Sequence, residues 1–170
     1  GSEMCIRDSL SMTYSLSAGF KGQNASIYIQ STEFEDKTGN SDNLKTNTLG
    51  VSFGFNYSDT LTGSAGAALS AIDNLHDKTK EKINSYNLSA SKIIIKDKLY
   101  SQLWAYWNTD SNDIKTVDID EKKASLEFTY QFNFNTALTV GFNRQSYVND
   151  ADTSQNRTQT GANLRVAYSF

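Results

Sequence analysis

The only histidine of this 170-residue chain, His76, lies between acidic residues, and this grouping is the first candidate for catalytic chemistry. Asp73 and Asp77 flank it, and Ser70 lies upstream. A serine nucleophile needs a histidine base within hydrogen-bond reach, and the base needs a third group that orients it. Neighbours in a polar loop rarely adopt that geometry. We therefore expect a solvated loop here, and we do not expect an enzyme.

Two acidic stretches suggest a second kind of chemistry, the binding of a divalent cation. Residues 110–113 read Asp-Ser-Asn-Asp and residues 150–152 read Asp-Ala-Asp, so oxygen ligands alternate along the chain, which suits Ca²⁺. Both stretches lack the glycine and the distant bidentate glutamate of an EF-hand loop. The lone cysteine, Cys5, is too little for a cysteine-based metal site or an internal disulfide. We expect polar loop surface and no metal or cofactor.

The composition limits the classes of protein to consider. The chain has 38% hydrophobic and 12% aromatic residues, a net charge of −3 and no proline. Average usage would supply about 5% proline, and proline is absent where every backbone N–H is needed in a β-ladder. The balanced charge argues against a nucleic-acid surface. No apolar run approaches the roughly 20 residues of a membrane-spanning helix, so helical spans are excluded.

The elements that position these side chains are visible as a period of two. In residues 124–135, Ala124, Leu126 and Phe128 begin an apolar series that alternates with polar residues. Such alternation is typical of a strand with two unlike faces. Similar segments occupy residues 10–20, 47–57 and 162–170, and weaker ones residues 25–34, 61–71, 84–95, 99–107 and 138–148. The sequence thus predicts nine strands.

The connections between these strands alternate in length. Short turns are expected at residues 21–24, 58–60, 96–98 and 135–137, and longer polar loops at residues 35–43, 72–82, 108–118 and 149–157. An up-and-down meander sorts its connections in this way, whereas the Greek-key connections of a soluble sandwich do not. Strands of about 9–11 residues, apolar on one face and joined by short and long connections in turn, are typical of transmembrane β-barrels. The predicted fold is therefore all-β, a transmembrane antiparallel up-and-down barrel.

The end of the chain makes this prediction more specific. The sequence closes on Phe170, with apolar residues at alternate positions before it: Leu164, Val166 and Tyr168. This strand resembles the terminal strand of Gram-negative outer-membrane β-barrel proteins, and the meander resembles the porins among them. The resemblance implies a bacterial outer-membrane location, a terminal strand read by the barrel assembly machinery, and periplasmic short turns. It also implies outer-membrane lipid and lipopolysaccharide as partners and a possible homotrimer. The acidic loop stretches could then meet divalent cations that bridge lipopolysaccharide.

A water-filled interior would explain the polar face of each strand. Ten polar residues are candidates to line it: Glu121, Lys123, Glu127, Thr129, Gln131, Asn133, Asn143, Gln145, Asn163 and Arg165. Their mixed charges predict weak ion selectivity. We expect a porin-like channel for passive diffusion of small polar solutes or ions. The alternatives are a non-conducting barrel that acts as an anchor or adhesin through its loops, and a soluble β-protein.

The sequence also predicts where the barrel begins and how two side chains of its strands are oriented. Residues 1–9 match no later pattern and are interpreted as a foreign leader or artefact, with residues 10–170 as the barrel. Single-chain bacterial barrels carry an even number of strands. The odd count of nine strands therefore predicts that the chain is the C-terminal portion of a larger barrel. The alternation also places Lys92 and Arg144 toward lipid, and it leaves open whether Trp104 and Tyr106 face lipid or lumen.

Overall fold

The computed structural model describes residues 7–36, 43–76 and 78–168, and within these ranges the chain forms nine β-strands and one short 3₁₀ turn. The strands are β1 (Arg7–Phe20), β2 (Gln23–Asp36), β3 (Leu44–Ser58), β4 (Leu61–Asn74), β5 (Lys80–Ile95), β6 (Leu99–Asn112), β7 (Asp118–Asn133), β8 (Thr136–Asn149) and β9 (Arg157–Tyr168). The 3₁₀ turn η1 (Thr153–Gln155) lies between β8 and β9. Among the described residues, no helix is long and apolar enough to cross a membrane.

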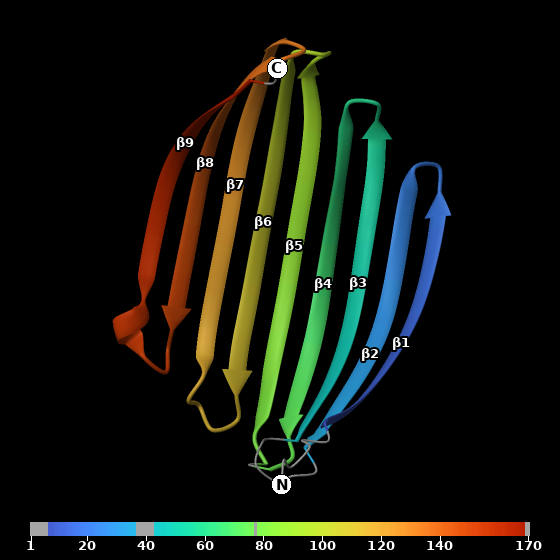
Figure 1. Ribbon diagram of the computed structural model, residues 1–170, viewed down its shortest axis with the longest axis vertical. Coiled ribbons are helices and arrows are strands. Elements are labelled where there is room, and N and C mark those ends of the chain that lie inside the picture. The colour runs from blue at the N-terminus through green and yellow to red at the C-terminus, as the bar shows by residue number, and fades with distance from the viewer. Residues whose placement is uncertain (1–6, 37–42, 77, 169–170) are drawn as a thin grey trace, which may run out of the picture.

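The strands form one antiparallel sheet in sequence order, from β1 at one edge to β9 at the other (Figure 1). Every strand pairs with the next one along the chain, and the described residues form no pairing between β1 and β9. The short turns gather at one end of the sheet and the longer connections at the other (Figure 1). The all-β meander predicted from the sequence is confirmed, and in this chain it is an open sheet.

The strands lie where the alternation predicts them, but most extend further toward the loop end. For example, β7 begins at Asp118 and β5 at Lys80, where the alternation of polar and apolar residues has already ended. Backbone pairing continues there because a ladder needs only N–H and C=O groups, whatever the side chains. The turn expected at residues 135–137 instead comprises Phe134 and Asn135, since β7 ends at Asn133.

The turns have the backbone conformations that tight hairpins need. Lys21 and Gly22 both have positive φ, 46° and 79°, which matches the two-residue turn whose twist suits an antiparallel pair. Asp97 has a φ of 58° in the three-residue turn between β5 and β6. Register shifts occur beside three of the turns, at Asn56/Ser58, Ile93/Ile95 and Gln131/Asn133. The alternation of faces therefore holds along the strands and changes only at their turn ends.

The two faces of the sheet differ in polarity and crowding. Ser125 is 7% exposed, whereas its chain neighbour Leu126 is 37% exposed on the other face. Side chains crowd together on the inside of a curved sheet and spread on its outside, so we call the face of Ser125 the concave face and that of Leu126 the convex face. No apolar side chain among the described residues is buried. In these residues the sheet lacks the hydrophobic core of a soluble β-protein, and most of its large aliphatic residues lie on the convex face.

The leader predicted at the N-terminus overlaps the first strand. β1 begins at Arg7, within residues 1–9, and its backbone pairs with Asp36 of β2. Residues 1–6, which include Cys5, lie outside the described residues. The division into residues 1–9 and residues 10–170 remains a prediction.

Candidate functional site

The candidate site is the polar wall that the concave face presents, and the sheet register assembles it from side chains distant in sequence. Glu121 pairs with Tyr147, Lys123 with Gln145, and Ser125 with Asn143 across β7 and β8. The same face continues into β9, where Thr139 pairs with Arg165 and Gly141 with Asn163. Nine of the ten candidate lining residues share this face: Glu121, Lys123, Glu127, Thr129, Gln131, Asn143, Gln145, Asn163 and Arg165.

The four charged residues among these nine neutralise one another in two pairs. Lys123 Nζ lies 2.9 Å from Glu121 Oε1, and the Gln145 side chain donates a hydrogen bond to the same oxygen at 3.1 Å. Arg165 Nη2 lies 4.0 Å from Glu127 Oε1 nearer the turn end. Both pairs combine one acid with one base, so this part of the wall presents local dipoles and no block of one sign.

Hydroxyl groups pair across neighbouring strands on the same face. Thr129 and Thr139 lie 2.9 Å apart through their hydroxyl oxygens, and Ser26 and Ser52 lie 2.7 Å apart. Three further cross-strand hydrogen bonds of this face join Thr48 with Ser70, Ser64 with Ser89, and Ser85 with Asn108. Each hydroxyl can rotate to bond water instead, so such a wall is compatible with a wet interior.

Asparagine side chains lie over glycines of the neighbouring strand. A Cβ atom at Gly141 would lie 2.1 Å from Asn163 Oδ1, and one at Gly161 would lie 2.9 Å from Asn143 Oδ1. The same relationship joins Asn24 to Gly54, at 2.2 Å. These amides lie flat along the wall because the glycines leave room for them, which keeps the wall polar without long side chains.

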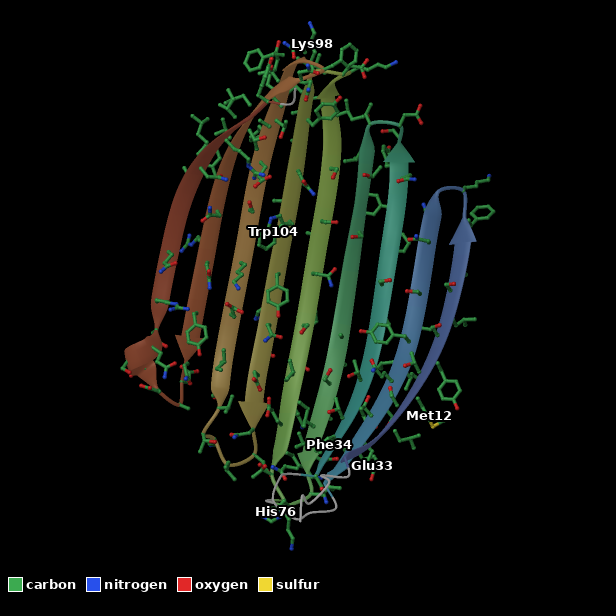
Figure 2. The ribbon with its side chains drawn as sticks, in the orientation of Figure 1. Met12, Glu33, Phe34, His76, Lys98 and Trp104 are labelled. Atoms are coloured by element: carbon green, nitrogen blue, oxygen red, sulfur yellow. The ribbon has the colours of Figure 1, made fainter. Side chains whose placement is uncertain are left out.

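The register resolves the orientation of the aromatic residues of β6. Trp104 pairs with Ser125 and Tyr106 with Lys123, which places both on the concave face. Leu103 pairs with Leu126 on the convex face. Trp104 lies midway along β6, whereas His76 and Lys98 mark the loop end and the turn end of the sheet (Figure 2). Sequence reasoning did not identify these aromatic wall residues, because β6 carries aromatic side chains on both of its faces.

One predicted lining residue departs from the wall. The register shift between Gln131 and Asn133 places Asn133 opposite Thr136, which belongs to the convex series of β8. The Asn133 side chain accepts a hydrogen bond of 2.9 Å from the backbone N–H of Asn135. Asn133 therefore supports the β7–β8 turn, and the placement expected from alternation is corrected by the bulge.

The C-terminal series lies on the convex face as alternation predicts. Leu164 pairs with Val140 and Val166 with Leu138, and Tyr168 is 61% exposed at the end of β9. Phe170 lies outside the described residues. The recognition of this strand by an assembly machinery remains a prediction.

Among the described residues of the grouping around His76, no hydrogen bond joins the histidine to Ser70. Ser70 lies on β4 with its hydroxyl 2.9 Å from that of Thr48. The backbone N–H of His76 donates a 3.0 Å hydrogen bond to Asn74 Oδ1 in the connection after β4. Asp77 lies outside the described residues.

One carboxylate of each acidic stretch, Asp113 and Asp152, supports local backbone structure. Asp113 Oδ1 accepts a 3.1 Å hydrogen bond from the backbone N–H of Lys80. Asp152 caps η1, where its carboxylate accepts hydrogen bonds from the backbone and hydroxyl of Ser154 and from the Gln155 side chain. The Ser154 hydroxyl contributes most to lowering the pKa of Asp152, followed by Gln155. Among the described residues, no three His, Cys, Asp or Glu side chains gather as a metal site.

Both cations that alternation places on the apolar side do lie on the convex face. Lys92 pairs with Leu61 and Ser101 close to the turn end of β5, and the nearby register shift begins only after it. Arg144 pairs with Ala124 and Thr160 toward the loop end. Each lies near one end of the apolar series, where a charged residue costs little in a membrane.

No protein-family model and no curated protein matches this chain, whereas solved structures match its fold. OmpT, an outer membrane protein of Vibrio cholerae, aligns with 94% of this chain and 55% of its own, with a TM-score of 0.66 and 9% identity. The anion-selective porin from Comamonas acidovorans aligns with 94% of this chain and 49% of its own, with a TM-score of 0.66 and 13% identity. The siderophore receptor PirA from Pseudomonas aeruginosa aligns with 93% of this chain and 31% of its own, with a TM-score of 0.70 and 13% identity.

These structures are bacterial outer-membrane proteins, and the chain has the fold of the outer-membrane β-barrel class. The expected resemblance to this class and the expected outer-membrane location agree with these neighbours. The chain spans 55% of the length of OmpT and 49% of that of the Comamonas porin. Its open sheet therefore corresponds to part of a closed barrel in those proteins.

Proposed function

We propose that the chain forms part of a porin-like outer-membrane channel through which small polar solutes or ions diffuse passively. The observation that carries the proposal is the concave wall of paired hydroxyls, amides and compensated charges such as Glu121 with Lys123. A wall of this kind favours a hydrated interior, while the exposed apolar residues of the convex face suit contact with lipid. The mixed signs of the charges support weak selectivity.

The proposal does not include catalysis. Among the described residues, no hydrogen bond joins the His76 ring to the Ser70 hydroxyl, and that hydroxyl pairs with the one of Thr48 instead. A hydrolase assay on the full-length protein should show no activity that depends on His76. Loss of such an activity in His76→Ala would contradict this part of the proposal.

The proposed partners are the lipids of the outer membrane, lipopolysaccharide among them, and the barrel assembly machinery. The convex series Leu164, Val166 and Tyr168 supports recognition of β9 during assembly. A trimer form of the Vibrio cholerae protein is among the similar structures, which supports the proposal of a homotrimer. Chemical cross-linking of the protein in intact outer membranes tests this oligomeric state.

A non-conducting barrel is the second candidate, and the aromatic residues of the wall favour it. Trp104 and Tyr106 project from β6 into the interior, where large side chains can fill space that a pore would leave to water. Such a barrel would act as an anchor or adhesin through its loops. Conductance distinguishes the two candidates.

The deciding experiment is to insert the full-length protein into planar lipid bilayers and record current. The channel predicts stepwise increases of conductance, with little preference between small cations and anions. Full-length protein that inserts into the bilayer but passes no current would reject the channel and favour the anchor. Replacing Trp104 by alanine in that protein would then show whether the ring obstructs the interior.

A further inference from the structure

The convex face carries a groove of about 560 Å³ near the loop end of strands β5 to β8. Its floor is formed by Ala105 and Ala124, which are paired across β6 and β7. Two methyl side chains next to each other leave a depression in a face otherwise covered by larger residues. Tyr86 and Trp107 form one wall, with ring centroids 5.2 Å apart.

Two rows of paired residues cross the groove. The row nearer the loops runs Tyr86, Trp107, Lys122 and Ser146 from β5 to β8, and the row nearer the middle runs Leu88, Ala105, Ala124 and Arg144. On the turn side of these rows the convex face is apolar, with Leu126 paired to Phe142. The groove therefore lies at the border between the apolar band and the polar loop end.

Two cations lie at this border. Lys122 stacks over the Trp107 ring at 5.2 Å and forms a 2.8 Å ion pair with Asp120. The Asp120 carboxylate also accepts a 2.9 Å hydrogen bond from the indole of Trp107. Lys122 and Arg144 are diagonal neighbours in the register, a relationship in which Cα atoms are typically about 7–8 Å apart. One phosphate group can reach both side chains across that distance.

Arg144 has fewer interaction partners than Lys122. In the part of the chain that the structure describes, its side chain forms no ion pair and no hydrogen bond with another residue. A guanidinium offers five donors in a planar fork that matches phosphate. On a surface in contact with lipid, a group of this kind is best satisfied by the anionic headgroup of a lipid.

We propose that this groove binds one phosphorylated lipid of the outer leaflet, with its phosphate between Lys122 and Arg144 and an acyl chain over Ala105 and Ala124. The occupant must carry its negative charge at the β7–β8 side of the groove, beside Lys122 and Arg144, and be apolar over the alanine floor and toward the apolar band. A lipid A molecule in that leaflet combines these two parts. The aromatic pair lies where aromatic girdles meet the membrane interface. The inference rests on the proposed function for its membrane orientation, with the loops outside.

The test uses the full-length protein reconstituted into phosphatidylcholine vesicles that contain diphosphoryl lipid A. Lipid that remains bound after gentle detergent extraction is measured by native mass spectrometry. Each Lys or Arg near an anionic surface contributes about 1 kcal/mol, so R144Q should weaken retention about fivefold and the K122Q/R144Q pair roughly thirtyfold. Lipid A without phosphates should be retained only weakly by the wild type. Its retention should equal that of diphosphoryl lipid A in the K122Q/R144Q variant.

Lys92→Gln is the matched control, because it removes a cation from the same face at the opposite end of the sheet. Retention in this variant should equal that of the wild type. Equal loss of lipid in K92Q and R144Q would overturn the site, since it would indicate general attraction to the protein. Unchanged retention in K122Q/R144Q would overturn it as well.

A second variant tests the groove without changing charge. Ala124→Leu fills the floor, so retention of diphosphoryl lipid A should fall although both cations remain. If A124L instead dissociates an oligomer of the protein and leaves lipid retention unchanged, the groove holds a second copy of the chain and the lipid proposal fails.

Failure of this proposal can be told apart from failure of the channel. Lys122 and Arg144 lie on the face opposite the wall, so K122Q/R144Q should leave bilayer conductance unchanged. A protein without conductance that still shows the loss of lipid in K122Q/R144Q would reject the channel and keep the lipid site.

Discussion

Phe55 of β3 lies directly against Gly63 of β4 on the convex face, where the two residues are paired across the strands. A Cβ atom at Gly63 would lie 2.5 Å from the Phe55 ring and 2.7 Å from the backbone carbonyl oxygen of Ser89. The ring covers a strand position that has no side chain of its own, an arrangement that helps fix register in β-sheets.

Gly63→Ala should therefore destabilise the folded protein. The ring can turn aside but the Ser89 carbonyl cannot, so we expect the overpacking cost of about 1–3 kcal/mol in the free energy of unfolding. Urea unfolding of the full-length protein in lipid vesicles measures it.

Gly19→Ala is the control, because the nearest atom to its Cβ is the Gln23 carbonyl oxygen at 3.5 Å, an ordinary contact. Equal stability of the two variants would contradict the close approach of the Ser89 carbonyl to Gly63.

The charged pairs of the wall should govern ion preference in an open channel. Glu127→Gln removes the acidic partner of Arg165, so an unpaired cation remains on the concave face and the channel should shift toward anions. The reversal potential in a salt gradient across a planar bilayer measures this shift. Lys92→Gln, on the convex face, should leave the reversal potential unchanged, and an equal shift in both variants would argue against Glu127 as a pore residue.

The loop between β8 and β9 should respond to acid through Asp152. Its pKa is lowered by hydrogen bonds that only the folded loop supplies, so the carboxylate stabilises η1 above the ordinary pKa of about 3.9. That stabilisation is lost as the pH falls through the lowered pKa of the folded loop. Hydrogen exchange at the Ser154 amide should accelerate over this acidic range relative to the intrinsic rate.

Asp152→Ala should produce the faster exchange already at neutral pH. Asp150→Ala is the matched variant in the same loop, since the hydrogen bond from residue 150 to Asp118 uses its backbone N–H alone. Similar exchange in the two variants would show that Asp152 does not hold the turn.

The open sheet predicts how the 170-residue chain behaves by itself. The outer edges of β1 and β9 have no strand partner among the described residues, and an exposed edge recruits another chain. We expect mixed oligomers in detergent and no single compact monomer. A single sharp shift between folded and unfolded bands on a heat-modifiability gel would contradict this prediction.

Much of the fold follows from the sequence because a strand exposes its two faces in strict alternation. The series from Ala124 to Phe132 defines β7, and the difference between short and long connections defines the meander. The bulge that redirects Asn133 was not predictable in the same way, since an extra residue at a turn is set by the closure of the hairpin and leaves no change in composition. The extension of β5 to Lys80 was not predictable either, because backbone pairing there does not depend on side-chain polarity.

The sequence by itself thus determined the strand order, the two unlike faces and most of the polar wall. Only the tertiary structure decided which face receives Trp104 and Tyr106, and which distant residues meet, such as Glu121 with Gln145 or Arg144 with the groove beside Trp107. The physical reason is that polarity within a strand is local, whereas register is a relation between strands. One backbone ladder places every side chain of β6 against those of β5 and β7, so each contact across the sheet depends on pairing that no single segment encodes.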